Sequence, residues 1–184
     1  LGLGVTPSAW GSGWKALQVT TGLALYNNAG DRAAMANNAY YSGSAWTYAV
    51  TGYATRYEQQ NGAHAWYTAG SGSGSITWSQ PMTLDASGNL GLGVTPSATW
   101  NSDKAFQFGT SANTCFLSSG DTSGAMNLGK NAYSIGSSPK YVGNGYATWY
   151  AQSAGQHQWY TSPSNSSGAG AAITFTQAMT LDAS

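Results

Sequence analysis

Two identical nonapeptides decide the architecture: residues 1–9 read LGLGVTPSA, and residues 90–98 repeat the same letters. Further matches follow in the same order, and GYAT at residues 52–55 returns at residues 145–148. The offset between matched segments therefore grows from 89 to 93 residues. Matched segments in a fixed order predict a tandem repeat. The predicted modules are residues 1–88 and 89–184.

A second growth of the offset marks a loop. MTLDAS at residues 82–87 returns at residues 179–184, an offset of 97. The added residues fall between HxWYT and the next isoleucine, where the first copy has seven residues (69–75) and the second has eleven (162–172). Insertions are tolerated in solvated loops, so we expect the copies to diverge there. Because MTLDAS is followed, after Gly88 and Asn89, by the second LGLGV, we expect the chain to belong to a longer array of modules of about 90 residues.

Apolar residues alternate with small or polar ones, which is typical of β-strands. The runs at residues 15–19, 46–50, 53–57 and 82–84 show this alternation, and clusters of Gly, Ser and Asn separate them. Residues 64–68 and 76–79 are expected to form a hairpin. The one segment that suggests a short helix is 31–37. The sequence thus predicts an all-β fold of two stacked modules.

Composition excludes several classes of protein. Only 7% of the residues are charged, six of each sign, whereas about 25% is usual. A nucleic-acid binder needs clustered Lys and Arg, and a membrane helix needs roughly 20 apolar residues in a row. The chain has neither pattern. We therefore expect no nucleic-acid partner and no membrane insertion.

Low charge also predicts self-association. Strand edges invite aggregation unless they are paired or carry charge, and a module of this size has a marginal core. The simplest solution is that copies of the chain share strands and apolar faces. We expect an obligate oligomer that is elongated along the repeat direction.

No catalytic residue is predicted. Glycan hydrolysis requires two carboxyl groups that flank the sugar bond. Two of the acids recur in the TLDAS turn, which favours a turn-forming role, and Glu58 has Ala151 as its counterpart. The acids considered are Asp31, Glu58, Asp85, Asp103, Asp121 and Asp182.

Metal and cofactor sites are not predicted either. His64 and His157 recur in a strand that contains no Cys, Asp or Glu, so a structural role is expected for both. The alternative is a cluster of these histidines on an oligomer axis that binds a metal or an anion. Cys115 lies in an apolar stretch and is expected to be a small buried residue.

The aromatic residues fall into two sets. Those that recur between the copies are expected to build each module: Tyr40/Tyr133, Tyr53/Tyr146, Tyr57/Tyr150, Trp66/Trp159, Tyr67/Tyr160 and Trp78/Phe175. Those that do not recur are freer to serve binding, and a loop Trp is a natural platform for a sugar ring. The candidates for receptor or glycan contact are Trp10, Trp14, Tyr41, Trp46 and Trp100. The alternative for them is packing against a neighbouring module or chain.

The segment MTLDASGNLGLGVTPSA at residues 82–98 resembles the shaft and distal modules of tail fibres and tailspikes of tailed bacteriophages. So do GYATRYEQQNGAHAWYT at 52–68 and GYATWYAQSAGQHQWYT at 145–161, so the resemblance covers both repeats. Such modules often precede a C-terminal self-cleaving chaperone domain. The resemblance implies a parallel homotrimer, rich in β-structure, on the tail of an extracellular virion.

The resemblance also implies a structural function without catalysis. The chain would be part of a tail fibre that supports or contributes to host attachment, with a surface glycan or protein as receptor. Its other partners would be its own copies and the neighbouring modules of the same longer chain. Two alternatives remain: a tailspike depolymerase that cleaves capsular polysaccharide or lipopolysaccharide, and a module of a bacterial surface adhesin.

Overall fold

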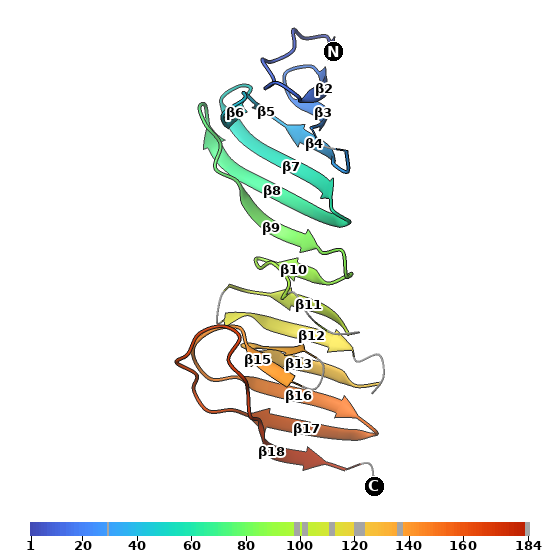
Figure 1. The fold of residues 1–184 in the computed structure, drawn as a ribbon, viewed down its shortest axis with the longest axis vertical. Coiled ribbons are helices and arrows are strands. Elements are labelled where there is room, and N and C mark those ends of the chain that lie inside the picture. The colour runs from blue at the N-terminus through green and yellow to red at the C-terminus, as the bar shows by residue number, and fades with distance from the viewer. Residues whose placement is uncertain are drawn as a thin grey trace. The chain divides into compact units, whose positions relative to one another are not determined.

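A computed structural model describes residues 1–28, 30–97, 100, 103–110, 113–119, 124–135 and 138–182. Its regular elements are β-strands, which confirms the predicted all-β class (Figure 1). The chain divides into two compact units, Leu1–Ala86 and Ser87–Ser184, called unit 1 and unit 2 below. Asp121, one of the acids considered above, lies outside the described residues.

Unit 1 is built on one sheet with the strand order β1-β2-β3-β4-β7-β8-β9. The first pair is parallel and the others are antiparallel. A separate hairpin, β5–β6, interrupts the meander between β4 and β7. The strands are β1 (Gly2–Leu3), β2 (Lys15–Val19), β3 (Leu23–Asn27), β4 (Ala33–Asn37), β5 (Ala39–Tyr41), β6 (Trp46–Tyr48), β7 (Gly52–Gln60), β8 (Ala63–Gly72) and β9 (Ser79–Leu84).

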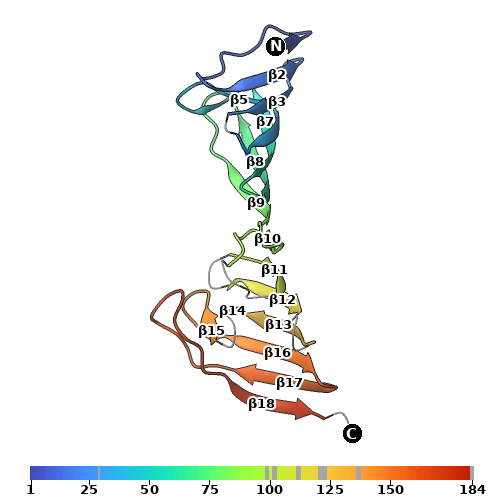
Figure 2. The same ribbon diagram turned by 45° about the vertical axis from the view of Figure 1, so that its right-hand side comes forward.

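Unit 2 has the same topology, with the strand order β10-β11-β12-β13-β16-β17-β18 and a hairpin, β14–β15. In Figure 2, the β15 arrow and the long loop after β17 stand to one side of the main strands. The strands are β10 (Leu90–Leu92), β11 (Lys104–Phe108), β12 (Cys115–Ser119), β13 (Met126–Lys130), β14 (Ala132–Ile135), β15 (Ser138–Tyr141), β16 (Thr148–Ser153), β17 (Gln156–Thr161) and β18 (Thr176–Leu181).

The helix suggested for residues 31–37 is wrong, because residues 33–37 form strand β4. Ala34 and Ala36 are buried, whereas Ala33 and Met35 are exposed, so burial follows a period of two. The strand pairs on both sides, with β3 and with β7. Two ladders of inter-strand hydrogen bonds outweigh the small intrinsic helix preference of alanine.

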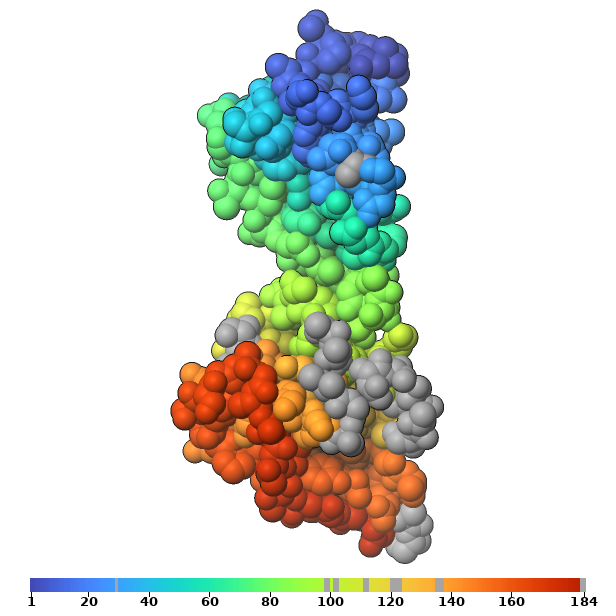
Figure 3. Space-filling model, viewed as in Figure 1, coloured from blue at the N-terminus to red at the C-terminus, as the bar shows by residue number. Residues whose placement is uncertain are grey.

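The β8–β9 and β17–β18 connections differ in length but contain equivalent buried isoleucines. Residues 73–78 connect β8 to β9, and residues 162–175 connect β17 to β18, so the expected strand at 76–79 lies mostly in the connection. Ile76 and Ile173 are both buried, and each donates its backbone N–H to the hairpin of its own unit. Figure 3 shows the longer loop, in red-orange, standing out from the surface of unit 2.

One asparagine in each unit joins the hairpin to the sheet. Asn38 and Asn131 are both in the left-handed region at φ 55°, which asparagine tolerates better than most residues. The Asn38 amide donates to the Tyr53 carbonyl at 3.0 Å, and its Oδ1 accepts from the Val50 N–H at 2.9 Å. Asn131 makes the same two kinds of bond in unit 2. These bonds fix the point where the chain leaves the sheet and returns to it.

The hairpin covers one face of each sheet, here called the inner face, and the hydrophobic core lies beneath it. In unit 1 the core includes Tyr26, Ala34 and Ala36, with Trp46 and Tyr48 of the hairpin packed on them. In unit 2 the corresponding buried residues are Trp100, Ala105, Phe116, Ala132, Tyr141, Ala147 and Ile173. The opposite, outer face of each sheet has no hairpin on it within the described part of its unit.

Candidate functional site

A row of apolar side chains crosses the outer face of each sheet. The strand registers place its members directly opposite one another on successive strands. We call this the central row. In unit 1 it consists of Leu17, Leu25, Met35, Tyr57, Trp66 and Met82. In unit 2 it consists of Phe106, Leu117, Leu128, Tyr150, Trp159 and Met179.

Five of the twelve side chains in the two central rows are exposed, and the other seven are half-buried. Leu25 and Met35 are 47% and 44% exposed, and Leu117 and Leu128 are 41% and 44% exposed. An antiparallel sheet with one covered face normally presents polar residues on the other. Contiguous apolar patches of this kind mark interaction surfaces. The outer face is therefore the candidate functional surface of both units.

The tyrosine of each central row belongs to a hydrogen-bonded group whose His and Gln lie in the adjacent row of the same face. In unit 1 the Tyr57 hydroxyl lies 2.5 Å from Nδ1 of His64 and accepts a hydrogen bond from the Gln59 amide at 3.0 Å. The His64 ring is stacked against Trp66 at an interplanar angle of 21°. In unit 2 the corresponding distances are 2.6 Å and 2.8 Å, and the stacking angle is again 21°.

This geometry gives both histidines a structural partner. Nδ1 of His64 and of His157 faces a tyrosine hydroxyl, and the ring lies against a tryptophan. Among the described residues, no group of three or more His, Cys, Asp or Glu side chains comes together to hold a metal ion. The two groups organise the surface of the outer face.

Four of the five predicted contact residues gather on the inner side of unit 1. Trp14 stacks on Tyr41 with ring centroids 4.7 Å apart, and its centroid lies 5.3 Å from that of Trp46. Trp10 lies 5.9 Å from Trp14 and 5.4 Å from Tyr26. All four predicted residues are half-buried, so they pack together while keeping part of their surface in solvent.

Trp100, the fifth predicted residue, belongs to the core of unit 2. It is 2% exposed, and its ring centroid lies 5.0 Å from that of Phe116. Its indole N–H donates to the Gln107 side chain at 3.2 Å. The folded unit therefore leaves no open indole face for a sugar ring at this position.

Trp100 also recurs structurally, which its sequence position concealed. The Trp10 indole donates to Gln18 at 3.2 Å, and the same Gln oxygen accepts from the Ser8 N–H at 2.6 Å. In unit 2, Gln107 accepts from Trp100 and from the N–H of Ser97 at the same two distances. The two tryptophans are 90 residues apart, whereas the flanking match has an offset of 89. The prediction that they do not recur was wrong because it assumed a loop of constant length.

The recurring tyrosines of the GYAT segments also need a correction, because they were assigned to packing and lie on the surface. Tyr53 and Tyr146 were expected to build their modules, but they are 73% and 71% exposed. The backbone carbonyl of each is held by Asn38 or Asn131. Recurrence therefore did not separate packing residues from surface residues.

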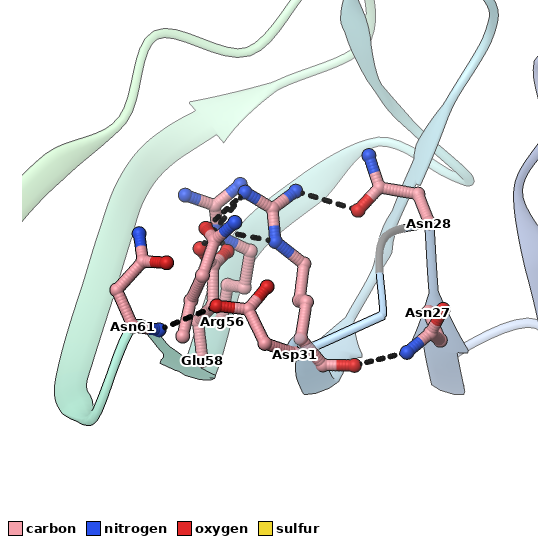
Figure 4. Close-up of polar contacts among 8 residues, drawn as sticks. Asn27, Asn28, Asp31, Arg56, Glu58 and Asn61 are labelled. Atoms are coloured by element: carbon pink, nitrogen blue, oxygen red, sulfur yellow. Dashed lines mark hydrogen bonds and ion pairs between the residues drawn. The ribbon is translucent and has the colours of Figure 1, made fainter.

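A cluster of charges lies on the inner side of unit 1 (Figure 4). Arg32 and Arg56 approach the two carboxylate oxygens of Glu58 at 3.3 Å and 3.6 Å, and Glu58 is 7% exposed. Arg32 also donates to Asn28 at 2.8 Å and to Gln60. The cluster joins the turn after β3 to strand β7.

Aromatic rings enclose the Arg56 guanidinium, which lies 3.9 Å from the ring centroid of Tyr67 and 4.8 Å from that of Trp46. Such cation–π contacts are stabilising when the cation is desolvated. Burial raises the pKa of the nearby Tyr26 phenol well above its usual range. The buried cation of this region is the Arg56 guanidinium, and the Glu58 carboxylate neutralises it.

The other predicted polar residues occupy structural positions. The Asp31 carboxylate accepts from the Asn61 N–H at 3.1 Å and ties two turns together. Asp182 accepts from Gln156 at 2.8 Å. Cys115 was expected to be buried, but it is half-buried on the outer face, because the alternation of β12 places Phe116 inside instead.

Comparison with known proteins adds no relative: no family model matches the chain, and no match was found among the curated proteins or the solved structures. Within the described part of the chain, no helix has the length and apolar character needed to span a membrane.

Proposed function

We propose that this chain is a structural component of a bacteriophage tail fibre, where it supports or contributes to attachment to a receptor on the host surface. The observation that carries the proposal is the outer face, which both units build from the same kinds of residue. The last three positions of the central row carry Tyr, Trp and Met in both units, and its first three are apolar in both. A module that repeats one outward surface suits a role in assembly along a fibre.

The inner sides of the units show this constancy only in part: Gln18 recurs as Gln107 and Tyr67 as Tyr160, but other positions differ. Arg56 and Glu58 of unit 1 correspond to Trp149 and Ala151 in unit 2. An inner side must fit only its own unit, so compensating changes are free to accumulate there. An outer side that keeps its residue types must fit something beyond the unit. That contrast supports a structural role over a catalytic one.

Receptor contact, within this proposal, is assigned to the half-buried aromatic cluster of unit 1. Trp10, Trp14, Tyr41 and Trp46 combine apolar ring faces with polar N–H and O–H groups, the combination that sugar binding uses. Trp100 is removed from this set because its indole is buried. The preferred receptor class remains a surface glycan.

The fibre assignment is tested by locating the chain on particles. In immunogold electron microscopy of phage particles that carry this chain, antibodies against the chain should label the tail fibres. The same antibodies should block adsorption of the particles to host cells. Gold on the bacterial surface alone would contradict the proposal and favour an adhesin. Release of reducing sugar from host polysaccharide by the purified full-length fibre would favour a depolymerase instead.

A further inference from the structure

We infer that the outer faces are the surfaces through which copies of this chain bind one another. The inference rests on the proposed structural role, and it names the surface and the partner that this role requires. Three properties of the outer faces carry it: their extent, their repetition and their charge.

The apolar surface extends beyond the central row. A neighbouring row on the same face includes Leu23 in unit 1 and Leu92 and Phe108 in unit 2, which are 37%, 48% and 38% exposed. Summed over both units, the large exposed apolar side chains of the outer faces offer on the order of 1,000 Å² per chain, against about 800 Å² that each partner buries in a standard interface. The outer faces are large enough to support stable association.

Repetition identifies the partner. A partner that covers both outer faces must present a complementary surface twice, because each unit offers Tyr, Trp and Met at the same register positions. A second copy of this chain has that repeat, since it carries the same two units. An unrelated globular partner would have no reason to fit both rows.

Charge agrees with self-association. In unit 1 the strand residue with a formal charge on the outer face is Lys15, and in unit 2 they are Lys104 and Lys130, all at strand ends. Arg56 and Glu58 point to the inner side, where they pair. Copies therefore meet without like charges in the centre of the face, where such pairs would be destabilising.

Cross-linking through single cysteines tests the inference. In a Cys115→Ser background, Leu25→Cys and Leu117→Cys each place a thiol at an exposed position of a central row. The matched control, Ser44→Cys, places it in the exposed turn of the β5–β6 hairpin. A short bis-maleimide added to each folded chain should give covalent oligomers from both face positions and at least tenfold less from the control.

Two results would overturn the inference: a face cysteine that cross-links no better than Ser44→Cys, or an uncrosslinked chain that remains a 19.0 kDa monomer. Far-ultraviolet circular dichroism confirms that each variant keeps its strands. Face-specific cross-links without gold on phage tails would retain the interface and reject the fibre role. Gold on phage tails without face-specific cross-links would retain the fibre role and reject the interface.

Discussion

The inner side of unit 1 holds charges where the inner side of unit 2 holds aromatic rings. In unit 1, Glu58 is enclosed by Arg32 and Arg56, and the Arg56 guanidinium lies over the Tyr67 ring. In unit 2, Trp149 occupies the position of Arg56 and packs on Phe116 at 4.8 Å. The strand order is the same in both units. The same fold therefore accommodates either an ion pair or a further aromatic ring at these matched positions beneath its hairpin.

The exchange involves several positions that change together. A methyl group added to Gly129 would lie 2.4 Å from the Phe116 ring, so the glycine leaves room for that ring. In unit 1 the corresponding positions, Ala36 and Ala24, are both small and both buried. Packing at native density requires such paired adjustments of volume. The outer rows lack this divergence, which points to a constraint from outside each unit.

The largest expected effect comes from removing the negative charge of unit 1. Glu58→Gln should lower the free energy of unfolding by about 3–5 kcal/mol, because breaking a buried ion pair leaves its partner uncompensated. Arg56 and Arg32, whose side chains are 10% and 19% exposed, would both lose their counter-charge. Urea unfolding followed by tryptophan fluorescence measures this loss. Asp182→Asn at an exposed position is the control, and an equal effect there would refute the role given to the cluster.

Trp100→Ala should be nearly as damaging, in the unit where Trp149 and Ala151 replace Arg56 and Glu58. Removing a buried Trp costs about 3–5 kcal/mol through lost packing and a residual cavity. Tyr146→Ala in the same unit should change stability by no more than about 0.5 kcal/mol, because exposed positions contribute little. Differential scanning calorimetry of both variants decides. A Trp100→Ala variant with an unchanged melting temperature would restore this residue as a surface candidate.

Gly129→Ala tests the volume exchange directly. The added methyl group would lie 2.4 Å from the Phe116 ring and 2.8 Å from the Thr148 carbonyl oxygen, and overpacking of a core costs about 1–3 kcal/mol. In a Phe116→Ala background the same change should cost less, which a double-mutant cycle detects as coupling between the two sites. Additive effects would show that Gly129 and Phe116 are independent.

A change of similar size, in adsorption and not in stability, should appear at the cluster assigned to glycan contact. Trp14→Ala should weaken adsorption of the fibre to host cells by about 1–3 kcal/mol, by analogy with other aromatic stacking contacts. Binding of the fluorescently labelled full-length fibre to host cells provides the measurement. The exposed Tyr53→Ala serves as the matched variant outside the cluster, and equal losses at both positions would contradict the assignment.

The alternation of apolar residues was enough to predict the strands, since Leu17 with Val19 and Tyr53 with Tyr57 lie in strands β2 and β7. Alternation does not say which face is covered when both faces are apolar, as in β3, where exposed Leu25 adjoins buried Tyr26. That choice depends on where the hairpin packs, a long-range property. For this reason the outer face was not found from sequence.

The candidate site was harder to predict for the same physical reason. Glu58 has no acid partner in the sequence, and although Arg56 lies two residues away on the same strand, Arg32 reaches Glu58 from the turn between β3 and β4. Trp10 and Trp100 each donate the indole N–H to a glutamine of the sheet, but one extra residue before Trp100 hid this correspondence in the sequence. Spacing along the chain reports neighbours within a strand, whereas these contacts join segments that only the folded sheet brings together.

Sedimentation equilibrium tests whether the outer faces hold copies of the chain together. The molecular mass measured for the unaltered chain should be a multiple of 19.0 kDa. A chain with Leu25→Lys and Leu117→Lys should sediment as a monomer, because like charges would then face each other in the centre of both interfaces. Its circular dichroism should still show strands, since both positions are exposed. A monomeric unaltered chain, or a double variant that keeps the full oligomer mass, would contradict the account.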